Sequence, residues 1–112
     1  MTDERKEQIR QKLSLHVWPP IENMLPSVVW VDGFPCELRI TRRETIYHVE
    51  YVNYDTDGES VEIEAEGKNL PSAIIEMLLN LLDMDEGYMI TYEDEKVGDD
   101  GHKQKFKLMV EL

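Results

Sequence analysis

The sequence predicts an α+β domain in which an antiparallel sheet carries one apolar helix on one face. In the segment Val61 to Glu66, apolar and acidic residues alternate as they do in a strand with one buried face. The next segment, Leu70 to Leu82, is apolar around most of its helical circumference, which is typical of a helix buried on more than one side. Further strand-like segments indicate the order α-β-β-β-β-α-β-β and a sheet of about five to six strands.

The N-terminal segment predicts a short helix. Thr2 or Asp3 can cap a helix that runs to about His16, because both side chains accept hydrogen bonds from the free N–H groups of a first turn. Pro19-Pro20 stop this helix, since a proline nitrogen has no hydrogen to donate. The apolar side of the helix is thin, so we expect it to dock on another element.

Three strands follow in the predicted order. Val28 to Val31 is a short apolar strand, and a turn that begins at Asp32-Gly33 leads into a second strand, Cys36 to Thr41. The third strand, Ile46 to Tyr54, is rich in β-branched and aromatic residues.

The hairpin between the third and fourth strands has two possible registers. A two-residue turn at Asp57-Gly58 would bury Glu50 on the apolar face, whereas a three-residue loop, Thr56-Asp57-Gly58, places Glu50 opposite Glu64 in solvent. Burying an unpaired carboxylate costs several kcal/mol, and two facing solvated glutamates cost at most about 1 kcal/mol. We therefore expect the three-residue loop. The apolar face then takes Tyr47, Val49 and Tyr51.

Asn69 is a good cap for the central helix, and Pro71 lies in the first turn, where a missing N–H does no harm. This helix is expected to lie between the sheet and the first helix, or to expose part of its surface to a partner. The last two strands, Tyr88 to Glu95 and Lys103 to Leu112, form a hairpin in which basic residues neutralise acidic ones. The expected pairs are Tyr88 with Val110, Ile90 with Leu108, Tyr92 with Phe106, Glu93 with Lys105 and Glu95 with Lys103.

The chain has 112 residues, which is enough for a single domain, residues 1–112, to bury a core without disulfides or metals. No apolar run is long enough to span a membrane, and the N-terminus lacks the signal-peptide pattern, so we expect a soluble cytoplasmic protein that does not bind membranes. The single cysteine, Cys36, has no histidine or aspartate placed near it by a recognisable motif. We interpret it as a buried or semi-buried small apolar residue.

The net charge of -12 is unevenly distributed along the chain. Residues 44–102 carry seventeen acidic and two basic residues, so nearly all of the negative charge is in the middle of the sequence. Proteins that bind nucleic acids or anionic membranes directly need a basic surface, which argues against both functions. The same charge is also compatible with a purely solubilising role.

Few residues indicate catalysis or metal binding. His16, His48 and His102 show no metal-ligand spacing, and the acidic turn that ends at Glu59 lacks the twelve-residue pattern of a calcium loop. No glycine-rich loop suited to phosphates is present, and no carboxylate pair is flagged by a surrounding apolar segment. We expect no enzymatic activity, no cofactor and no metal.

Glu62, Glu64 and Glu66 form the most specific pattern. Alternate strand residues lie about 6.6 to 6.8 Å apart, so the three carboxylates would form a regular row of negative charge without an evident basic neighbour. Such a row can imitate a phosphate backbone towards a basic groove, and the simpler alternative is the solvated outer face of an antiparallel sheet. The predicted partner-binding residues are Glu50, Asp55, Asp57, Glu59, Glu62, Glu64 and Glu66.

A short first helix, the turn Tyr54-Asp55-Thr56-Asp57-Gly58-Glu59, an acidic strand, a helix and strong negative charge resemble the small acidic inhibitors that phages carry against host nucleases. These include anti-CRISPR proteins that act as DNA mimics in the DNA-binding groove of Cas9. The resemblance implies a phage-type inhibitor of a nucleic-acid-binding enzyme. A second resemblance is to antitoxin domains whose hairpin precedes a helix, as in Tyr47 to Leu82, although the Pro-Gly-rich strand of those domains is absent here.

We therefore expect a non-enzymatic protein that binds a basic surface of a protein partner and blocks a nucleic-acid-binding site there. Electrostatic attraction would steer the encounter and pair the carboxylates with lysine and arginine side chains. The alternative is a homo-oligomeric structural or accessory protein that associates through the apolar helix and the segment Val28 to Val31.

Overall fold

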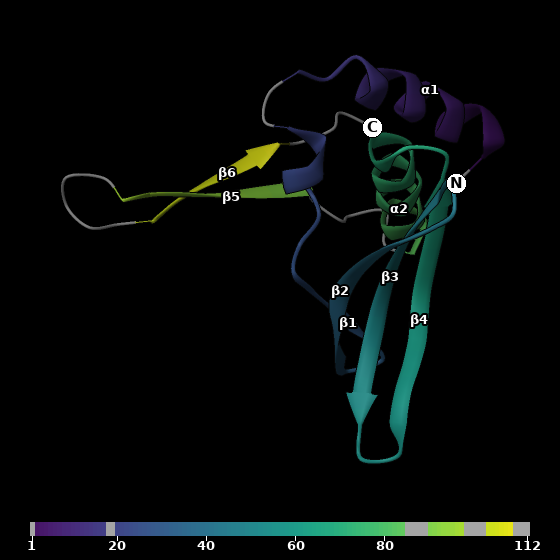
Figure 1. The fold of residues 1–112 in the computed structure, drawn as a ribbon. Coiled ribbons are helices and arrows are strands. Elements are labelled where there is room, and N and C mark those ends of the chain that lie inside the picture. Colours follow the sequence, from purple (N-terminus) through teal and green to yellow (C-terminus); the bar gives the residue numbers. More distant parts are fainter. Residues whose placement is uncertain (1, 18–19, 85–89, 98–102, 109–112) are drawn as a thin grey trace.

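The structure, a computed structural model, describes residues 2–17, 20–84, 90–97 and 103–108 (Figure 1). The elements occur in the predicted order, with an additional short 3-10 helix, η1, before the first strand. Their bounds are α1 Asp3–Ser14, η1 Ile21–Asn23, β1 Val28–Val31, β2 Phe34–Arg43, β3 Ile46–Asp55, β4 Gly58–Gly67, α2 Leu70–Met84, β5 Ile90–Val97 and β6 Lys103–Leu108.

Four strands form an antiparallel sheet in the order β1-β2-β3-β4, and β5 and β6 pair only with each other. The fold is therefore α+β, as predicted, but the expected sheet of five to six strands is wrong in size. A physical reason lies at β4, which is an edge strand. Its Glu64 carbonyl accepts a hydrogen bond from the Asn80 side-chain amide at 2.8 Å, so α2 already occupies a backbone acceptor of that strand.

The turns between strands are tight. Asp32 and Gly33 both have positive φ, 51° and 83°, as the two central residues of a type I′ hairpin turn require. This two-residue turn brings Phe34 and Pro35 into β2, which is why the strand begins before the predicted Cys36. At the other end of β2, Glu44 takes a positive φ of 57° in the turn to β3.

The β3–β4 hairpin has the predicted register, with Glu50 opposite Glu64 and Tyr51 opposite Ile63. The predicted three-residue loop is wrong, however, because Gly58 pairs with Asp55 and leaves only two residues between them. A β-bulge beside Tyr51 shifts the register by one residue and reconciles the short turn with the predicted pairs. The extra residue of this bulge is Glu62.

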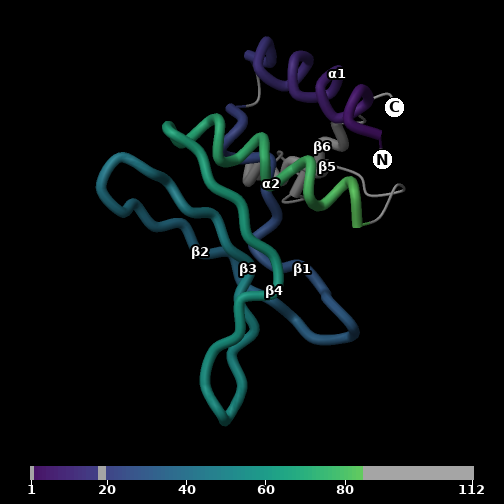
Figure 2. Tube along the Cα trace, turned by 90° about the vertical axis from the view of Figure 1, so that its right-hand side faces the viewer, coloured from purple at the N-terminus to yellow at the C-terminus, as the bar shows by residue number. Residues whose placement is uncertain are grey.

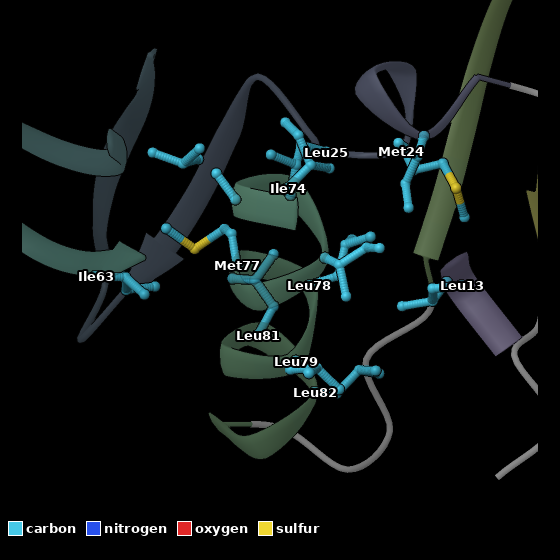
Figure 3. Packing of buried hydrophobic residues seen from close by; sticks show 14 of the residues in the cluster. Leu13, Met24, Leu25, Ile63, Ile74, Met77, Leu78, Leu79, Leu81 and Leu82 are labelled. Atoms are coloured by element: carbon cyan, nitrogen blue, oxygen red, sulfur yellow. The ribbon is translucent and has the colours of Figure 1, made fainter. Parts of the chain in front are cut away.

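Helix α2 lies between the sheet and α1 (Figure 1). Its N–H at Ser72 donates to the Asn69 side chain at 2.9 Å, which confirms the predicted cap. In Figure 3, Ile63 of β4 lies on one side of α2 and Leu13 of α1 on the other. The helix buries residues around most of its axis: Ala73, Ile74, Ile75, Met77, Leu78, Leu79, Leu81 and Leu82.

Helix α1 is docked by apolar and ionic contacts. Thr2 caps it by accepting from the Arg5 N–H at 3.2 Å, and Ile9 and Leu13 are buried in the core. The Arg10 guanidinium donates to Glu76 of α2 at 2.7 Å, and this pairing raises the pKa of Arg10 above its ordinary value. Neither helix, nor η1, is long and apolar enough to cross a membrane.

The passage from β4 into α2 requires a glycine. A Cβ at Gly67 would lie 2.5 Å from the backbone nitrogen of Ala73, which is closer than any side chain can approach. Because the contact is with helix backbone, no side-chain movement could relieve it.

The separate β5–β6 hairpin pairs Ile90 with Leu108, Tyr92 with Phe106 and Glu93 with Lys105, as predicted. Beyond Glu93 the register shifts, so that Lys103 lies opposite Val97 and not opposite the predicted Glu95. The expected pair of Tyr88 and Val110 lies outside the described residues.

The Asn69 cap gives a direct test of the α2 boundary. Replacement by alanine leaves the Ser72 N–H without its acceptor, and we expect the free energy of unfolding to fall by about 1 kcal/mol. Asn69→Asp keeps an acceptor and should retain most of the stability. Urea denaturation of the three proteins measures the difference, and equal losses in both variants would contradict the assignment.

Candidate partner-binding surface

All seven predicted partner-binding residues lie on the β3–β4 hairpin, and residues 46–67 contain no lysine or arginine. The turn of this hairpin extends beyond the helices in two perpendicular views (Figures 1 and 2). One side of the sheet is covered by α2, and we call the opposite side the open face. Cross-strand pairing places Arg39, Glu50 and Glu64 in one row of the open face, with Thr41, His48 and Glu66 in the next.

Arg39 of β2 is the basic residue that faces the hairpin acids. Its guanidinium forms ion pairs with Glu59 at 2.9 Å and with Glu50 at 3.2 Å. These two carboxylates, Glu59 first, raise the pKa of Arg39 above its ordinary value. Two of the seven acids are therefore neutralised within the protein itself.

Glu50 does not lie in solvent as expected, because only 9% of its side chain is exposed. The expectation rested on the cost of burying an unpaired carboxylate, and Arg39 supplies the missing partner. Glu50 is thus a structural residue more than a binding one. The signal was present in the sequence, because Arg39 falls on the outward-facing set of the predicted second strand.

The predicted row of three glutamates is broken. Val61 pairs with Val52 and Ile63 with Tyr51, and because Val52 and Tyr51 point to opposite faces of β3, Val61 and Ile63 do so on β4. Val61 is accordingly 41% exposed and not in the core, where it was expected. The bulge residue between them, Glu62, leaves the row.

A hydrogen bond and an electrostatic effect indicate where the Glu62 side chain lies. Its carboxylate accepts a hydrogen bond from the Ser60 hydroxyl at 2.7 Å, and Ser60 pairs with Asn53 on the same face of the sheet as Tyr51. The pKa of the Cys36 thiol is raised mainly by burial and, as a second cause, by the negative charge of Glu62. Glu62 therefore lies on the side of α2, while the remaining two glutamates share the open face.

Glu64 and Glu66 line a shallow hollow of about 440 Å³ on the open face, together with Arg43, His48, Glu50 and Ala65. The His48 ring nitrogen Nδ1 lies 3.8 Å from the Glu66 carboxylate, which is an ion pair only when the imidazole is protonated. Both glutamates are exposed, and their carboxylates are available to a positively charged group of another molecule.

Asp55 and Asp57 lie at the hairpin turn, beyond the helix layer (Figure 2). The Asp55 carboxylate accepts a hydrogen bond from the Asp57 N–H at 2.9 Å, which stabilises the turn in the way that aspartate side chains commonly do. Both side chains are exposed. They extend the negative charge to the end of the hairpin.

The open face also has an apolar end that the sequence did not single out as a unit. Val28, Glu37, Val52 and Val61 lie side by side across all four strands, and Trp30 and Tyr54 lie one position further towards the turns. Trp30 is 67% exposed and Tyr54 is 51% exposed, whereas Val52 beneath them is buried. We call the residues Val28, Trp30, Val52, Tyr54 and Val61 the apolar end.

Neither a metal centre nor a reactive thiol emerges in the part of the chain that is described with side chains. No group of three or more histidine, cysteine, aspartate or glutamate residues there could hold a metal ion. Cys36 is fully buried, as predicted, and its thiol lies 3.7 Å from the Phe34 carbonyl. Burial raises the pKa of this thiol, which reduces the fraction of reactive thiolate.

The fold and this surface define an acidic α+β protein in which no described helix covers one face of the sheet. Comparison of the chain with models of protein families gives no match, and neither does comparison with curated proteins or with solved structures.

The Arg39 ion pairs predict a specific loss of stability. Arg39→Met leaves the Glu50 carboxylate buried without its partner, and we expect the melting temperature to fall by roughly 5–15 °C. The double variant Arg39→Met/Glu50→Leu removes both charges and should recover most of this loss, because apolar pairs often replace buried ion pairs at little cost. Arg43→Met, on the same strand, is the control and should shift the melting temperature only slightly. A double variant as unstable as Arg39→Met would contradict the assignment.

Burial of Cys36 predicts slow thiol chemistry. At pH 8 a raised pKa leaves less thiolate than in a free cysteine, and the closed core keeps reagents out, so we expect Ellman's reagent to react at least about a hundredfold more slowly with the folded protein than in urea. The rate at which glutathione reacts with Ellman's reagent, measured in buffer and in urea, corrects for the effect of urea on the reagent. Similar rates for folded and unfolded protein would show that the thiol is accessible.

Proposed function

We propose that this protein binds a basic surface of a protein partner through the acidic hairpin, and that the partner surface is one that otherwise holds nucleic acid. The observation that carries the proposal is the hairpin composition. Of its seven carboxylates, Arg39 pairs with Glu50 and Glu59, and Glu62 lies on the side of α2. Asp55, Asp57, Glu64 and Glu66 remain without a lysine or arginine partner among the residues described with side chains.

The location of these carboxylates supports the proposal. Glu64 and Glu66 lie on the open face, on the same side as the hollow beside His48, and the turn aspartates extend beyond the helices. A concentration of like charge at an exposed edge raises the association rate with an oppositely charged surface. Lysine and arginine side chains that hold phosphates are such a surface, because carboxylates and phosphates share their charge and their acceptor geometry.

Self-association through the apolar helix α2 and the segment Val28 to Val31 was the alternative prediction. Eight residues of this helix are buried between the sheet and α1, which leaves little of it for a second copy. A partner of opposite charge is therefore the better supported of the two functions.

Charge reversal tests the proposal. The protein and its variant Glu64→Lys/Glu66→Lys would be immobilised and exposed to a cell lysate at low and high salt, with bound proteins identified by mass spectrometry. We expect basic nucleic-acid-binding proteins on the unmodified protein, released at high salt, and an affinity at least about tenfold lower for the variant.

Two controls separate location from net charge. Glu4→Lys/Glu22→Lys makes the same change in net charge at α1 and η1, and Glu62→Lys reverses a charge on the opposite face of β4. Both should retain most of the binding. Partners that stay bound at high salt, or an equal loss of binding in all variants, would contradict an interface on the open face.

A further inference from the structure

The apolar end lies directly beside the acidic part of the open face. Val28, Val61 and Tyr54 are 42%, 41% and 51% exposed, and Trp30 is 67% exposed. In both views, the half of the sheet that holds β1 and the β3–β4 turn extends away from α1 and α2 (Figures 1 and 2). Exposed apolar and aromatic side chains that gather on one face of a sheet typically mark an interaction surface.

One of the two aromatic rings at this end lies beside a carboxylate. Tyr54 lies directly opposite Glu59 across the hairpin, so the ring and the carboxylate are cross-strand neighbours on the open face. Glu59 already holds one guanidinium, that of Arg39, at 2.9 Å. Elsewhere in the chain the Arg42 guanidinium lies 5.6 Å from the centre of the Tyr47 ring, which shows the second contact that an aromatic ring offers to arginine.

We propose that the apolar end recognises arginine side chains of the partner, which stack on Trp30 or Tyr54 while the exposed carboxylates of the open face, Glu64 and Glu66 among them, pair with guanidinium groups of the same partner. This inference rests on the proposed function and specifies the chemistry of its partner. Arginine suits the site better than lysine, because the planar guanidinium both stacks on aromatic rings and forms two parallel hydrogen bonds with a carboxylate. A lysine ammonium is a strongly hydrated point charge that gains mainly from the carboxylates.

Charge argues against a second copy of this chain as the occupant. A copy placed face to face would bring Glu64 and Glu66 of one open face towards the same residues of the other, and neither hairpin contains a lysine or arginine. Like charges brought together at an interface oppose association. A basic partner relieves the repulsion among the acids and covers the apolar end at the same time.

Arginine and lysine homopeptides of equal length test the inference, because they carry the same charge. Isothermal titration calorimetry at about 150 mM salt should show the arginine peptide binding at least about fivefold more tightly. Trp30→Ala/Tyr54→Ala should lower the arginine affinity to that of lysine and leave the lysine affinity unchanged. In a Trp18→Phe background, Trp30 is the remaining tryptophan. The arginine peptide should quench its fluorescence more strongly than the lysine peptide does.

Phe34→Ala is the matched control. Phe34 is an exposed aromatic residue of the same β1–β2 hairpin, but it pairs with Val31 and lies on the opposite face, so the arginine preference should survive its loss. Circular dichroism and thermal melts check that the variants fold. Trp30→Leu/Tyr54→Leu keeps apolar area on both strands without an aromatic ring, and should also lose the preference.

The outcomes separate this inference from the proposed function. Equal affinities for the two peptides, both weakened by Glu64→Lys/Glu66→Lys, would overturn the arginine site and leave the acidic interface standing. An arginine preference that persists without both aromatic rings would also overturn it. Binding of neither peptide would remove both proposals. If sedimentation experiments show a dimer, and the Trp30→Ala variant is a monomer, the apolar end binds a second copy of this chain and the arginine site is overturned.

Discussion

The burial of α2 on both of its sides is the constraint on which the rest of the structure depends. A helix that is apolar all round needs two covering layers, and the protein provides them with the four-stranded sheet and with α1. The face of the sheet that packs against α2 must therefore be apolar. No described helix packs on the other face, so its residues do not have to be apolar.

The open face combines two kinds of acidic residue that differ in role. Glu50 is held by Arg39 and takes part in keeping β2, β3 and β4 together, whereas Glu64 and Glu66 lie in solvent. A bulge of one residue completes this separation, because it turns Glu62 and Ser60 towards the side of α2. A uniform acidic strand in the sequence is thus divided between two faces in three dimensions.

The sequence predicted well what depends on local patterns. The strand β1, the Asn69 cap, the burial of Cys36 and the pairing of Glu50 with Glu64 follow from alternation, capping and apolar periodicity. It failed where distant segments decide the outcome. Arg39, which compensates the cost of burying the Glu50 carboxylate, comes from another strand. No local sequence pattern indicates a bulge at Glu62.

The apolar end was missed for a related reason. Trp30, Tyr54 and Val61 come from three different strands, and each by itself has an ordinary strand context in the sequence. Only the registers of the three hairpins bring them to one end of one face. Conversely, the predicted five to six-stranded sheet assumed that every hairpin joins the same sheet, which hydrophobic alternation alone cannot decide.

The extension of the β3–β4 hairpin beyond the helices has a consequence for motion. Residues 54–61 are all exposed, so their backbone hydrogen bonds have no core beneath them, whereas residues 49–52 are buried. Amide hydrogens near the turn should therefore open to exchange at a lower free-energy cost than those of the buried segment. The buried segment of the hairpin is therefore expected to be rigid and the exposed turn to move more easily. Tyr54, Asp55 and Asp57 lie in the exposed part. Its twist can adjust to the shape of a partner without disturbing the packing of α2.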